Sequence, residues 1–147
     1  MHIIGVDTGG SYTRIWNGIQ PVRKMVTPHH YPQYLQMLST ALKEYEPIQT
    51  LVIALPAVIA HHCVVKAPNL GDGWNNQNIE ADIRKLLMVK GHVHICQDTE
   101  AAGYAVQMQE LDLDPTMIVT LSTGVGGALV NKRQVLPFCV AVVSQAV

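Results

Sequence analysis

The sequence predicts an α/β fold: a mixed five-stranded sheet flanked by helices, followed by the start of a second lobe. Three short strands joined by tight turns open the chain, and amphipathic helices then alternate with short apolar strands. A unit of strand, glycine turn and strand occurs near residues 3–17 and again near 117–130. We therefore expect two related lobes, residues 1–112 and 113–147, of which only the first is complete.

The opening strands are expected at residues 3–8, 12–17 and 20–26, where short apolar runs are separated by turn residues. Asn17 and Gly18 form the signal for the second turn, because this dipeptide favours the tight turns of hairpins. These strands form an antiparallel meander.

One amphipathic helix is expected from Tyr31 to Glu46, since apolar residues recur there at helical spacing and Pro47 closes the segment. Residues 50–56 are continuously apolar and short, which is typical of a strand at the centre of a sheet, buried on both faces. Residues 61–67 form another extended stretch.

A second helix is expected from Ile79 toward Gly91, followed by a short strand at residues 93–96. Asp98 or Thr99 then caps a third helix, so that Asp98 lies where a strand becomes a helix. A new meander begins after the acidic linker at residues 111–115.

Composition excludes some classes of partner. Lys and Arg total 10 against 11 for Asp and Glu, so no net field favours nucleic acid or an anionic membrane. No apolar run reaches the ~20 residues that span a bilayer. The widely spaced Cys63, Cys96 and Cys139 have the pattern of reduced core thiols, which predicts a cytoplasmic protein.

The stretch GVDTGGSYTRI, residues 5–15, predicts a nucleotide-phosphate site. Glycine lets backbone N–H groups converge on phosphate oxygens because no Cβ blocks the approach. We expect Gly9, Gly10 and Ser11 to face the phosphates and Asp7 to hold Mg²⁺, directly or through water. Neither the Walker pattern nor GxGxxG is present. In isolation, a plain hairpin turn is the simpler explanation of these residues.

The second glycine turn, near Thr123, Gly124, Gly126 and Gly127, is expected to grip the same phosphates from the opposite side of a cleft. A hairpin is again the simpler explanation for one such turn. The two turns together, each at a strand end, favour a nucleotide clamp.

Asp98 is the candidate general base for phosphoryl transfer to an alcohol, because the positive end of a helix favours its ionised carboxylate. A role as helix N-cap is an alternative and is compatible with catalysis. Asn69 offers an amide donor and a carbonyl acceptor, which suit sugar hydroxyls. Trp74 covers the core in preference to stacking on a sugar.

These motifs, taken in order, resemble those of the ROK family of bacterial sugar kinases, repressors and related proteins. Residues 7–14 (DTGGSYTR) are similar to the family's DxGGTxxR, with Ser11 in place of threonine. Residues 55–59 (LPAVI) stand where the family has a Pro-Gly pair beside the sugar, with Ala57 in place of the glycine. The resemblance runs from about residue 3 to about residue 136 and implies the actin-like ATPase (ribonuclease H-like) fold.

Three further motifs carry the resemblance. Residues 67–74 (APNLGDGW) resemble the family's sugar loop APNLxxW with a slightly longer loop. Residues 97–102 (QDTEAA) resemble NDANAA, with Gln97 and Glu100 in place of asparagines. Residues 122–128 (STGVGGA) resemble GTGxGGG with the first and last glycines changed.

The resemblance implies ATP and Mg²⁺ as cofactors and a small-molecule sugar as substrate. It implies that Asp98 contacts the sugar and accepts its hydroxyl proton, and that Asn69 and Gln97 orient the sugar. Asp7 organises Mg²⁺, and the two glycine turns hold phosphate.

The resemblance ends near residue 136. The family's Glu-x-Gly-His segment, its CxCGxxGCxE zinc site and a further glycine-rich adenosine loop do not occur in the sequence, so no zinc site is expected in this chain. Residues 136–147 are interpreted as an apolar tail of a truncated protein.

Two functions follow. The first is a ROK-type sugar kinase lobe, whose complete form transfers the ATP γ-phosphate to a hexose or N-acetyl-hexosamine hydroxyl, while the 147-residue chain itself is weakly active or inactive. The alternative is a non-catalytic sugar-binding or assembly module. A homo-oligomer is possible through the apolar tail, and DNA binding is disfavoured because no helix-turn-helix segment precedes the first loop.

Overall fold

The computed structural model describes residues 2–109, 115–121, 125–131 and 134–140. The chain forms two compact units, Met1–Asp98 and Thr99–Val147. The predicted lobe boundary at residue 112 stays a prediction.

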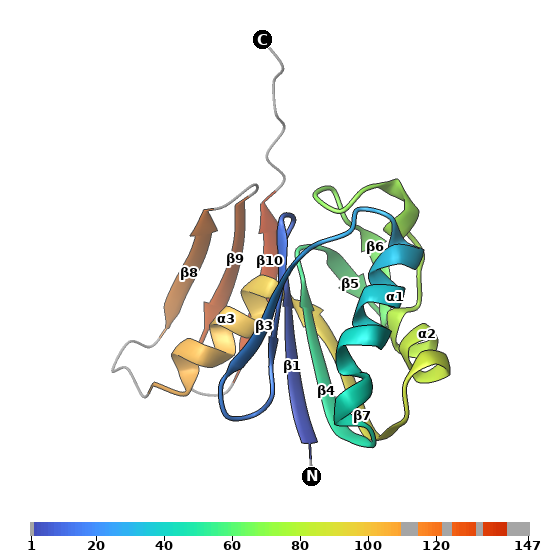
Figure 1. Ribbon diagram of the computed structural model, residues 1–147. Coiled ribbons are helices and arrows are strands. Elements are labelled where there is room, and N and C mark those ends of the chain that lie inside the picture. Colours follow the sequence, from blue (N-terminus) through green and yellow to red (C-terminus); the bar gives the residue numbers. More distant parts are fainter. Residues whose placement is uncertain (1, 110–114, 122–124, 132–133, 141–147) are drawn as a thin grey trace. The chain divides into compact units, whose positions relative to one another are not determined.

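The first unit is built on a mixed five-stranded sheet in the order β3-β2-β1-β4-β7 (Figure 1). β2 pairs antiparallel with β1 and β3, whereas β4 pairs parallel with β1 and β7. The predicted fold class is therefore confirmed, with the opening meander at one side of the sheet. The strands are β1 (His2–Thr8), β2 (Tyr12–Trp16), β3 (Pro21–Val26), β4 (Ile48–Leu55) and β7 (Val89–Gln97).

The turn between β2 and β3 confirms the Asn-Gly signal. The Asn17 Oδ1 atom accepts hydrogen bonds from the backbone N–H groups of Ile19 and Gln20 at 3.1 and 3.0 Å. Gly18 has a φ of +90°, which a residue with a Cβ rarely adopts.

The inner strand β4 is the apolar run that was expected at the centre of the sheet. On the side that faces the core, Leu51, Ile53 and Leu55 are fully buried. On the other side Ala54 is buried but Val52 is only half-buried. The central position is confirmed, and burial on both faces holds only toward the end of the strand.

Two helices cover one face of this sheet (Figure 1). α1 (Tyr31–Leu42) continues into the 3₁₀ helix η1 (Lys43–Tyr45), so the predicted helix is confirmed with a change of helix type in its last turn. α2 (Ile79–Leu86) begins at Asn78, whose side chain accepts a hydrogen bond from the Ala81 N–H at 2.9 Å. One apolar core joins both helices to the sheet; among its fully buried members are Ile4, Ile15, Tyr34, Leu38, Leu42, Leu51, Ile53, Ile79 and Ile83.

A hairpin of β5 (Val58–Ala60) and β6 (Cys63–Lys66) follows β4. His61 and His62 form its turn, with φ values of 49° and 64°. Two successive positive φ angles are the geometry that matches the twist of a two-residue hairpin. The expected extended stretch at 61–67 is thus a shorter strand, and β5 was not predicted.

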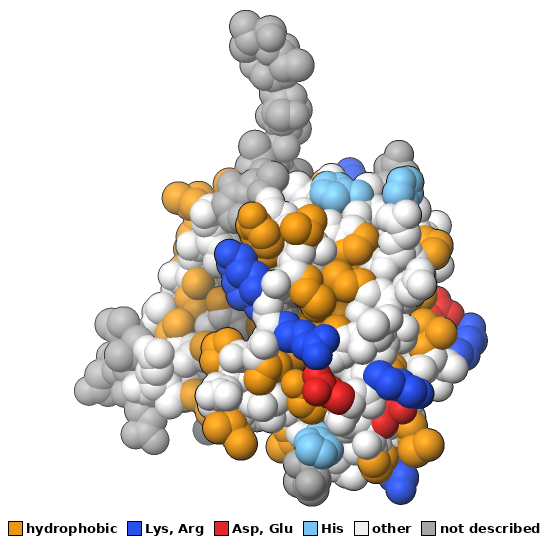
Figure 2. Space-filling model, viewed as in Figure 1, with side chains coloured by type: hydrophobic (Ala, Val, Ile, Leu, Met, Phe, Trp, Pro, Cys, Tyr) orange, Lys and Arg blue, Asp and Glu red, His pale blue; other side chains and the backbone are white. Residues whose placement is uncertain are grey.

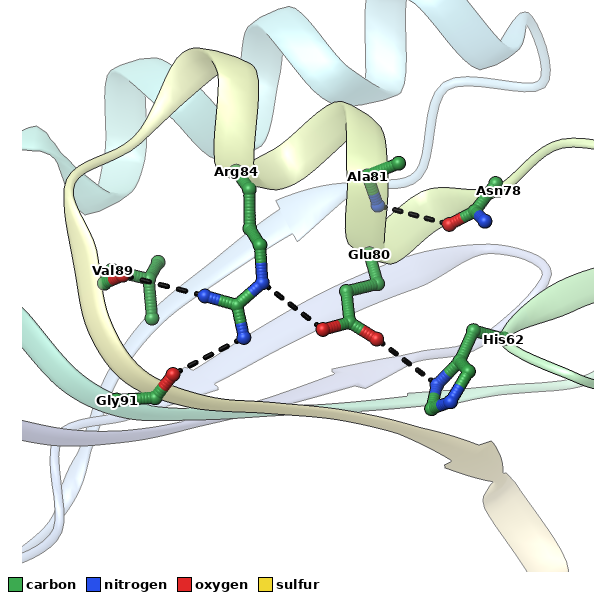
Figure 3. Close-up of polar contacts among 7 residues, drawn as sticks. All are labelled: His62, Asn78, Glu80, Ala81, Arg84, Val89 and Gly91. Carbon is green, nitrogen blue, oxygen red and sulfur yellow. Dashed lines mark hydrogen bonds and ion pairs between the residues drawn. The ribbon is translucent and has the colours of Figure 1, made fainter.

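A polar network ties α2 to its neighbours (Figure 3). Glu80 lies 3.0 Å from both His62 Nδ1 and Arg84 Nε. The Arg84 guanidinium also donates to the carbonyls of Val89 and Gly91 at 3.4 and 3.1 Å. Glu80 and Arg84 therefore link α2 to the β5–β6 hairpin and to β7.

Gly91 does not end a helix, which corrects the prediction for residues 79–91. α2 ends at Leu86, and β7 begins already at Val89 instead of residue 93. The register between β4 and β7 shifts here, and a Cβ on Gly91 would collide with the carbonyl of Gln49. The glycine serves a close strand approach, a role that periodicity along one segment does not reveal.

The second unit has a three-stranded antiparallel sheet in the order β10-β9-β8, with α3 (Asp98–Gln107) packed on one face. Gly103 of α3 lies so close to Val135, Ala128 and Val130 that a Cβ there would press on their side chains. The predicted meander is confirmed, with strands β8 (Thr116–Leu121), β9 (Val125–Val130) and β10 (Val135–Val140). The interpretation of residues 136–147 as a tail is wrong as far as Val140, because β10 pairs with β9 along its length.

Charges of both signs are mixed among hydrophobic side chains on the face shown in Figure 2, in keeping with a net charge of −1. Of the helices in the described residues, none combines the length and the apolar character needed to cross a bilayer.

Asp82 joins the two helices of the first unit. Its carboxylate accepts a hydrogen bond from the Tyr31 hydroxyl at 3.1 Å and lies 2.8 Å from Lys85 Nζ. The hydrogen bond from Lys85 and the one from Tyr31 lower the pKa of Asp82 below its ordinary value near 3.8. Burial raises the pKa of Tyr31, and the Asp82 charge raises it further.

We expect Asp82→Asn to lower the free energy of unfolding at pH 7 by about 1 kcal/mol, since a partly exposed charged hydrogen bond is lost. A carboxyl with a depressed folded pKa contributes stability that is present above its unfolded pKa and is lost as pH falls through the folded pKa. The difference between wild type and variant should therefore disappear well below pH 3.8 in urea denaturation. Glu44→Gln, which removes the exposed pair with Arg23, is the control and should cost less than about 0.5 kcal/mol.

Candidate active site

One edge of the first unit's sheet, where the parallel strands β1, β4 and β7 end, carries Asp7, the first glycine turn, Gln97 and Asp98. Asp7, Ala54 and Cys96 occupy matching positions on these strands, and Gln97 lies opposite Leu55. Neighbouring strands are ~4.8 Å apart, so the backbones at Asp7 and Cys96 are roughly 10 Å apart. Ligands of open α/β sheets bind at this carboxyl edge.

The first glycine turn, residues 9–11, connects β1 to β2 at this edge. The Gly9 N–H donates to the Tyr12 carbonyl at 2.8 Å, and the Thr27 N–H donates to the Ser11 carbonyl at 3.0 Å. A Cβ on Gly9 would lie 3.3 Å from the Tyr12 oxygen, which is a tight contact. Ser11 is exposed and Gly9 and Gly10 are half-buried, so solvent reaches the turn.

Two buried threonines, Thr13 and Thr27, stabilise this turn through hydrogen bonds. The Thr27 hydroxyl donates to the Gly9 carbonyl at 2.8 Å and lies 2.9 Å from the Thr13 hydroxyl. Because the Thr27 proton goes to Gly9, Thr13 is the donor in the second bond. Sequence reasoning missed Thr27, which follows β3 and carries no motif that local patterning detects.

A second buried bond fixes the end of β1. The Thr8 and Tyr34 hydroxyls are 2.8 Å apart, and both side chains are fully buried. Burial raises the pKa of Tyr34, the Thr8 bond opposes this, and the Asp7 charge adds to it. Tyr34 is therefore a neutral hydroxyl at physiological pH that anchors β1 to α1.

Asp7 is open to solvent, with its side chain 55% exposed. Its Oδ2 atom lies 3.0 Å from Nη1 of Arg14, the residue directly opposite on β2. Mg²⁺ binds one or two carboxylates together with phosphate oxygens, so a single exposed carboxylate beside a glycine turn fits such a cation. Among the described residues no three metal-binding side chains cluster, and Mg²⁺ at Asp7 stays a prediction.

Asp98 lies where β7 becomes α3, as the sequence predicts: β7 ends at Gln97 and α3 begins at Asp98. The side chains of Gln97 and Asp98 are both half-buried, so solvent reaches the Asp98 carboxylate. The partial positive charge of the helix N-terminus favours the ionised form. The catalytic role of Asp98 and the sugar contacts of Asp98 and Gln97 stay predictions.

The loop that carries Asn69 is docked on the start of α1. Trp74 is fully buried against the rings of Tyr31 and Tyr34, with centroids 5.3 and 4.6 Å away, and its Nε1–H donates to the His29 carbonyl at 3.0 Å. The core role expected for Trp74 is confirmed. Asn69 is half-buried, and its contact with sugar stays a prediction.

The second glycine turn lies in the other unit. Thr123 and Gly124 are outside the described residues, whereas Gly126 and Gly127 belong to β9. A Cβ on Gly126 would press on the Thr99 side chain, and one on Gly127 would press on the Phe138 ring. Both glycines thus have packing reasons, and the convergence of the two turns on one phosphate group stays a prediction.

A three-stranded meander followed by two parallel strands, with an acid at the end of the first strand and another after the last, defines the class of actin-like ATPase folds. Solved structures share this fold. An inorganic polyphosphate/ATP-glucomannokinase from Arthrobacter sp. strain KM is 20% identical with a TM-score of 0.77, over 94% of this chain and 61% of that chain. A ROK family glucokinase from Streptomyces griseus, in complex with glucose and AMPPNP, is 20% identical with a TM-score of 0.74, over 92% and 46%.

A ROK family transcriptional regulator, described as a homolog of the E. coli MLC protein, shares the fold at 17% identity and a TM-score of 0.69, over 92% of this chain and 38% of that chain. None of the curated proteins compared with the chain by sequence matches it. The ROK family model matches residues 3–136. The chain belongs to the ROK family, and it spans about two-fifths to three-fifths of the length of these solved relatives.

Thr27→Val should destabilise the first unit by about 1–3 kcal/mol, because the Gly9 carbonyl and the Thr13 hydroxyl both lose a buried partner. Thr13→Val should cost less, since Thr27 keeps its bond to Gly9. Urea denaturation measures both, and amide exchange at Gly9, whose N–H donates to the Tyr12 carbonyl, should quicken only in the Thr27 variant. Thr40→Val, on the exposed side of α1, is the control; equal costs for all three variants would contradict the bridging role.

Proposed function

We propose that this chain is the first lobe and the start of the second lobe of a ROK sugar kinase, whose complete form transfers the γ-phosphate of ATP to a sugar hydroxyl. The observation that supports this most is the parallel register of β1, β4 and β7, which brings Asp7 and Asp98 to one edge of the sheet. Phosphoryl transfer needs phosphates held in place, a cation and a carboxylate that accepts the hydroxyl proton.

Each need has a candidate in the chain. Asp98 accepts the proton of the sugar hydroxyl, and the exposed Asp7 carboxylate holds Mg²⁺. The N–H groups of Gly10 and Ser11 face the phosphates, while that of Gly9 donates to the Tyr12 carbonyl and holds the turn. Thr123, Gly124, Gly126 and Gly127 supply the second set. When bound, Mg·ATP supplies the phosphoryl group and the cation neutralises its charge. Arg14 competes with a cation for Asp7, so the ion pair weakens when Mg²⁺ binds.

The substrate class is a hexose or an N-acetyl-hexosamine. Asn69 and Gln97 supply amide groups that donate to and accept from sugar hydroxyls, and both are half-buried. Gln97 is one methylene longer than the asparagine usual in the family, which places its amide farther from the end of β7. This difference bears on which sugar fits.

The 147-residue chain by itself is expected to have little or no kinase activity, since it spans only part of the length of its solved relatives. A non-catalytic sugar-binding or assembly module is the second candidate. Ala57, Gln97 and Glu100 depart from the family's sugar-side residues, and a ROK transcriptional regulator shares the fold. Such a module keeps the sugar contacts and lacks phosphoryl transfer.

A coupled assay of ADP release over a panel of hexoses and N-acetyl-hexosamines tests the expected inactivity. We expect turnover at the level of the Asp98→Asn variant, because the chain lacks the family's adenosine loop. Robust turnover that Asp98→Asn abolishes would overturn the expectation of inactivity and would establish Asp98 as the base.

Calorimetric titration separates the two candidates. A kinase lobe should bind both sugar and Mg·ATP, and Asn69→Ala should weaken sugar binding about tenfold through loss of a polar contact. Gln36→Ala, an exposed amide on α1, is the matched control and should leave binding unchanged. Sugar binding without Mg·ATP binding favours the module, and no binding of either ligand contradicts both candidates.

A further inference from the structure

Residues 27–34, which connect β3 to α1 and include the first turn of α1, contact both candidate ligand loops of the first unit. At one end they bind the glycine turn, residues 9–11. They also bind residues 67–74, which we call the Asn69 loop. We call residues 27–34 the linking segment. All of its contacts described below lie within the first unit.

On the side of the Asn69 loop, the contacts meet at one backbone carbonyl. The Trp74 Nε1–H donates to the His29 carbonyl at 3.0 Å. Gly71 approaches the same oxygen, since its φ is +99° and a Cβ there would lie only 3.3 Å from it. The fully buried Trp74 ring also packs on Tyr31 and Tyr34. One hydrogen bond and two ring contacts therefore hold the Asn69 loop to the linking segment.

On the side of the glycine turn, the contacts come from both ends of the linking segment. Thr27 binds the Gly9 carbonyl through its hydroxyl at 2.8 Å and the Ser11 carbonyl through its N–H at 3.0 Å. The Tyr34 hydroxyl lies 2.8 Å from that of Thr8, the residue before the turn. The side chains of Thr8, Thr27 and Tyr34 are all buried, so these bonds are stronger than exposed ones.

The backbone between these two sets of contacts is short and stiff. Only Pro28 separates Thr27 from His29. Proline fixes its own φ at about −65° and restricts the residue before it to extended geometry, so few soft torsions remain between the two bonds. His30, the N-cap of α1, makes no side-chain capping bond. The position of the first turn of α1 therefore depends on tertiary contacts such as those with Trp74.

We propose that the linking segment holds the Asn69 loop and the glycine turn as one rigid body, with Trp74, Thr27 and Tyr34 as positioning residues. A sugar that restrains the Asn69 loop then also restrains the turn that faces the phosphates. The inference rests on the proposed function for the ligands of the two loops, whereas the link between the loops is measurable without a ligand. A coupling of this kind acts equally in both directions.

Amide exchange of the 147-residue chain, followed by NMR without ligand, tests the link from the Asn69 loop to the turn. Trp74→Phe keeps an aromatic ring in the core and removes the indole N–H. We expect exchange at the Gly9 and Thr27 N–H groups to quicken by about three- to tenfold relative to the Ile48 N–H, at the start of β4. Ile83→Val, which removes a methyl group from the same core, is the control for a general loss of stability and should leave these ratios unchanged. Equal quickening at all three amides in Trp74→Phe, or none, would overturn the proposal.

The reverse direction supplies a second test, which holds even if Trp74→Phe does not fold. In Thr27→Val the indole N–H signal of Trp74 should shift, and its exchange should quicken by about threefold. Thr13→Val, which leaves the Thr27 bond to Gly9 intact, is the matched control and should leave the signal in place. The indole of Trp16, on β2, is the reference within each sample. A Trp74 indole signal that is identical in wild type and both variants contradicts the proposal.

Addition of sugar separates this inference from the proposed function. D-glucose or N-acetyl-D-glucosamine, at a concentration that saturates each protein in calorimetry, should slow exchange at the Gly9 and Thr27 N–H groups by about threefold in wild type and leave it unchanged in Trp74→Phe. A sugar that binds wild type without slowing exchange at either amide refutes the inference and leaves the proposed function standing. If neither sugar binds, the proposed function fails for these sugars, while the ligand-free comparisons still decide whether the two loops are linked.

Discussion

The parallel register of β1, β4 and β7 is the constraint on which the candidate site depends. Side chains alternate between the faces of a strand, so a slip of one residue would turn Asp7 into the core and expose its buried neighbour Thr8. The core prevents such a slip, because Val6 packs beside Ile53 on the face that α1 and α2 cover. The exposed acid at the end of β1 is thus a consequence of how the apolar residues of the core pair.

Buried hydroxyls extend this control to the glycine turn. Glycine gives the turn its shape but makes it flexible, since no side chain restricts the backbone. Thr27 compensates by holding the Gly9 carbonyl, and its own backbone N–H holds Ser11. Because a hydrogen bond is stronger and an unpaired group costlier in a buried setting, these bonds make the turn more rigid than its composition suggests.

Local patterning was sufficient where one segment determines its own structure. The helix from Tyr31, the central strand β4 and the position of Asp98 between strand and helix follow from periodicity, a proline and a polar residue after an apolar run. The bridging role of Thr27 and the bond between Tyr31 and Asp82 depend on segments distant in sequence, 18 and 51 residues away. These contacts form only when the chain folds, so the pattern of one segment does not predict them.

The same division holds for the candidate site, where local patterning predicts some residues and not others. Asp7 and Asp98 each follow an apolar strand, and that local pattern located both. Tyr34 and Thr27, which hold the surroundings of Asp7, resemble ordinary core residues in the sequence, and only their partners distinguish them. The sequence therefore predicts the exposed candidate residues better than the buried residues that hold their surroundings.

Glycine motifs illustrate why resemblance alone leaves roles open. Gly126 fits a phosphate turn, yet a Cβ there would push against Thr99, the residue after Asp98. Packing against Thr99 therefore requires glycine at position 126 whether or not a nucleotide binds. Packing at Gly126 also affects the candidate base. A side chain that displaces Thr99 disturbs the first turn of α3, and the positive end of this helix favours the charged form of Asp98. A change at Gly126 therefore alters the candidate base through the helix, even if no phosphate ever touches the glycine.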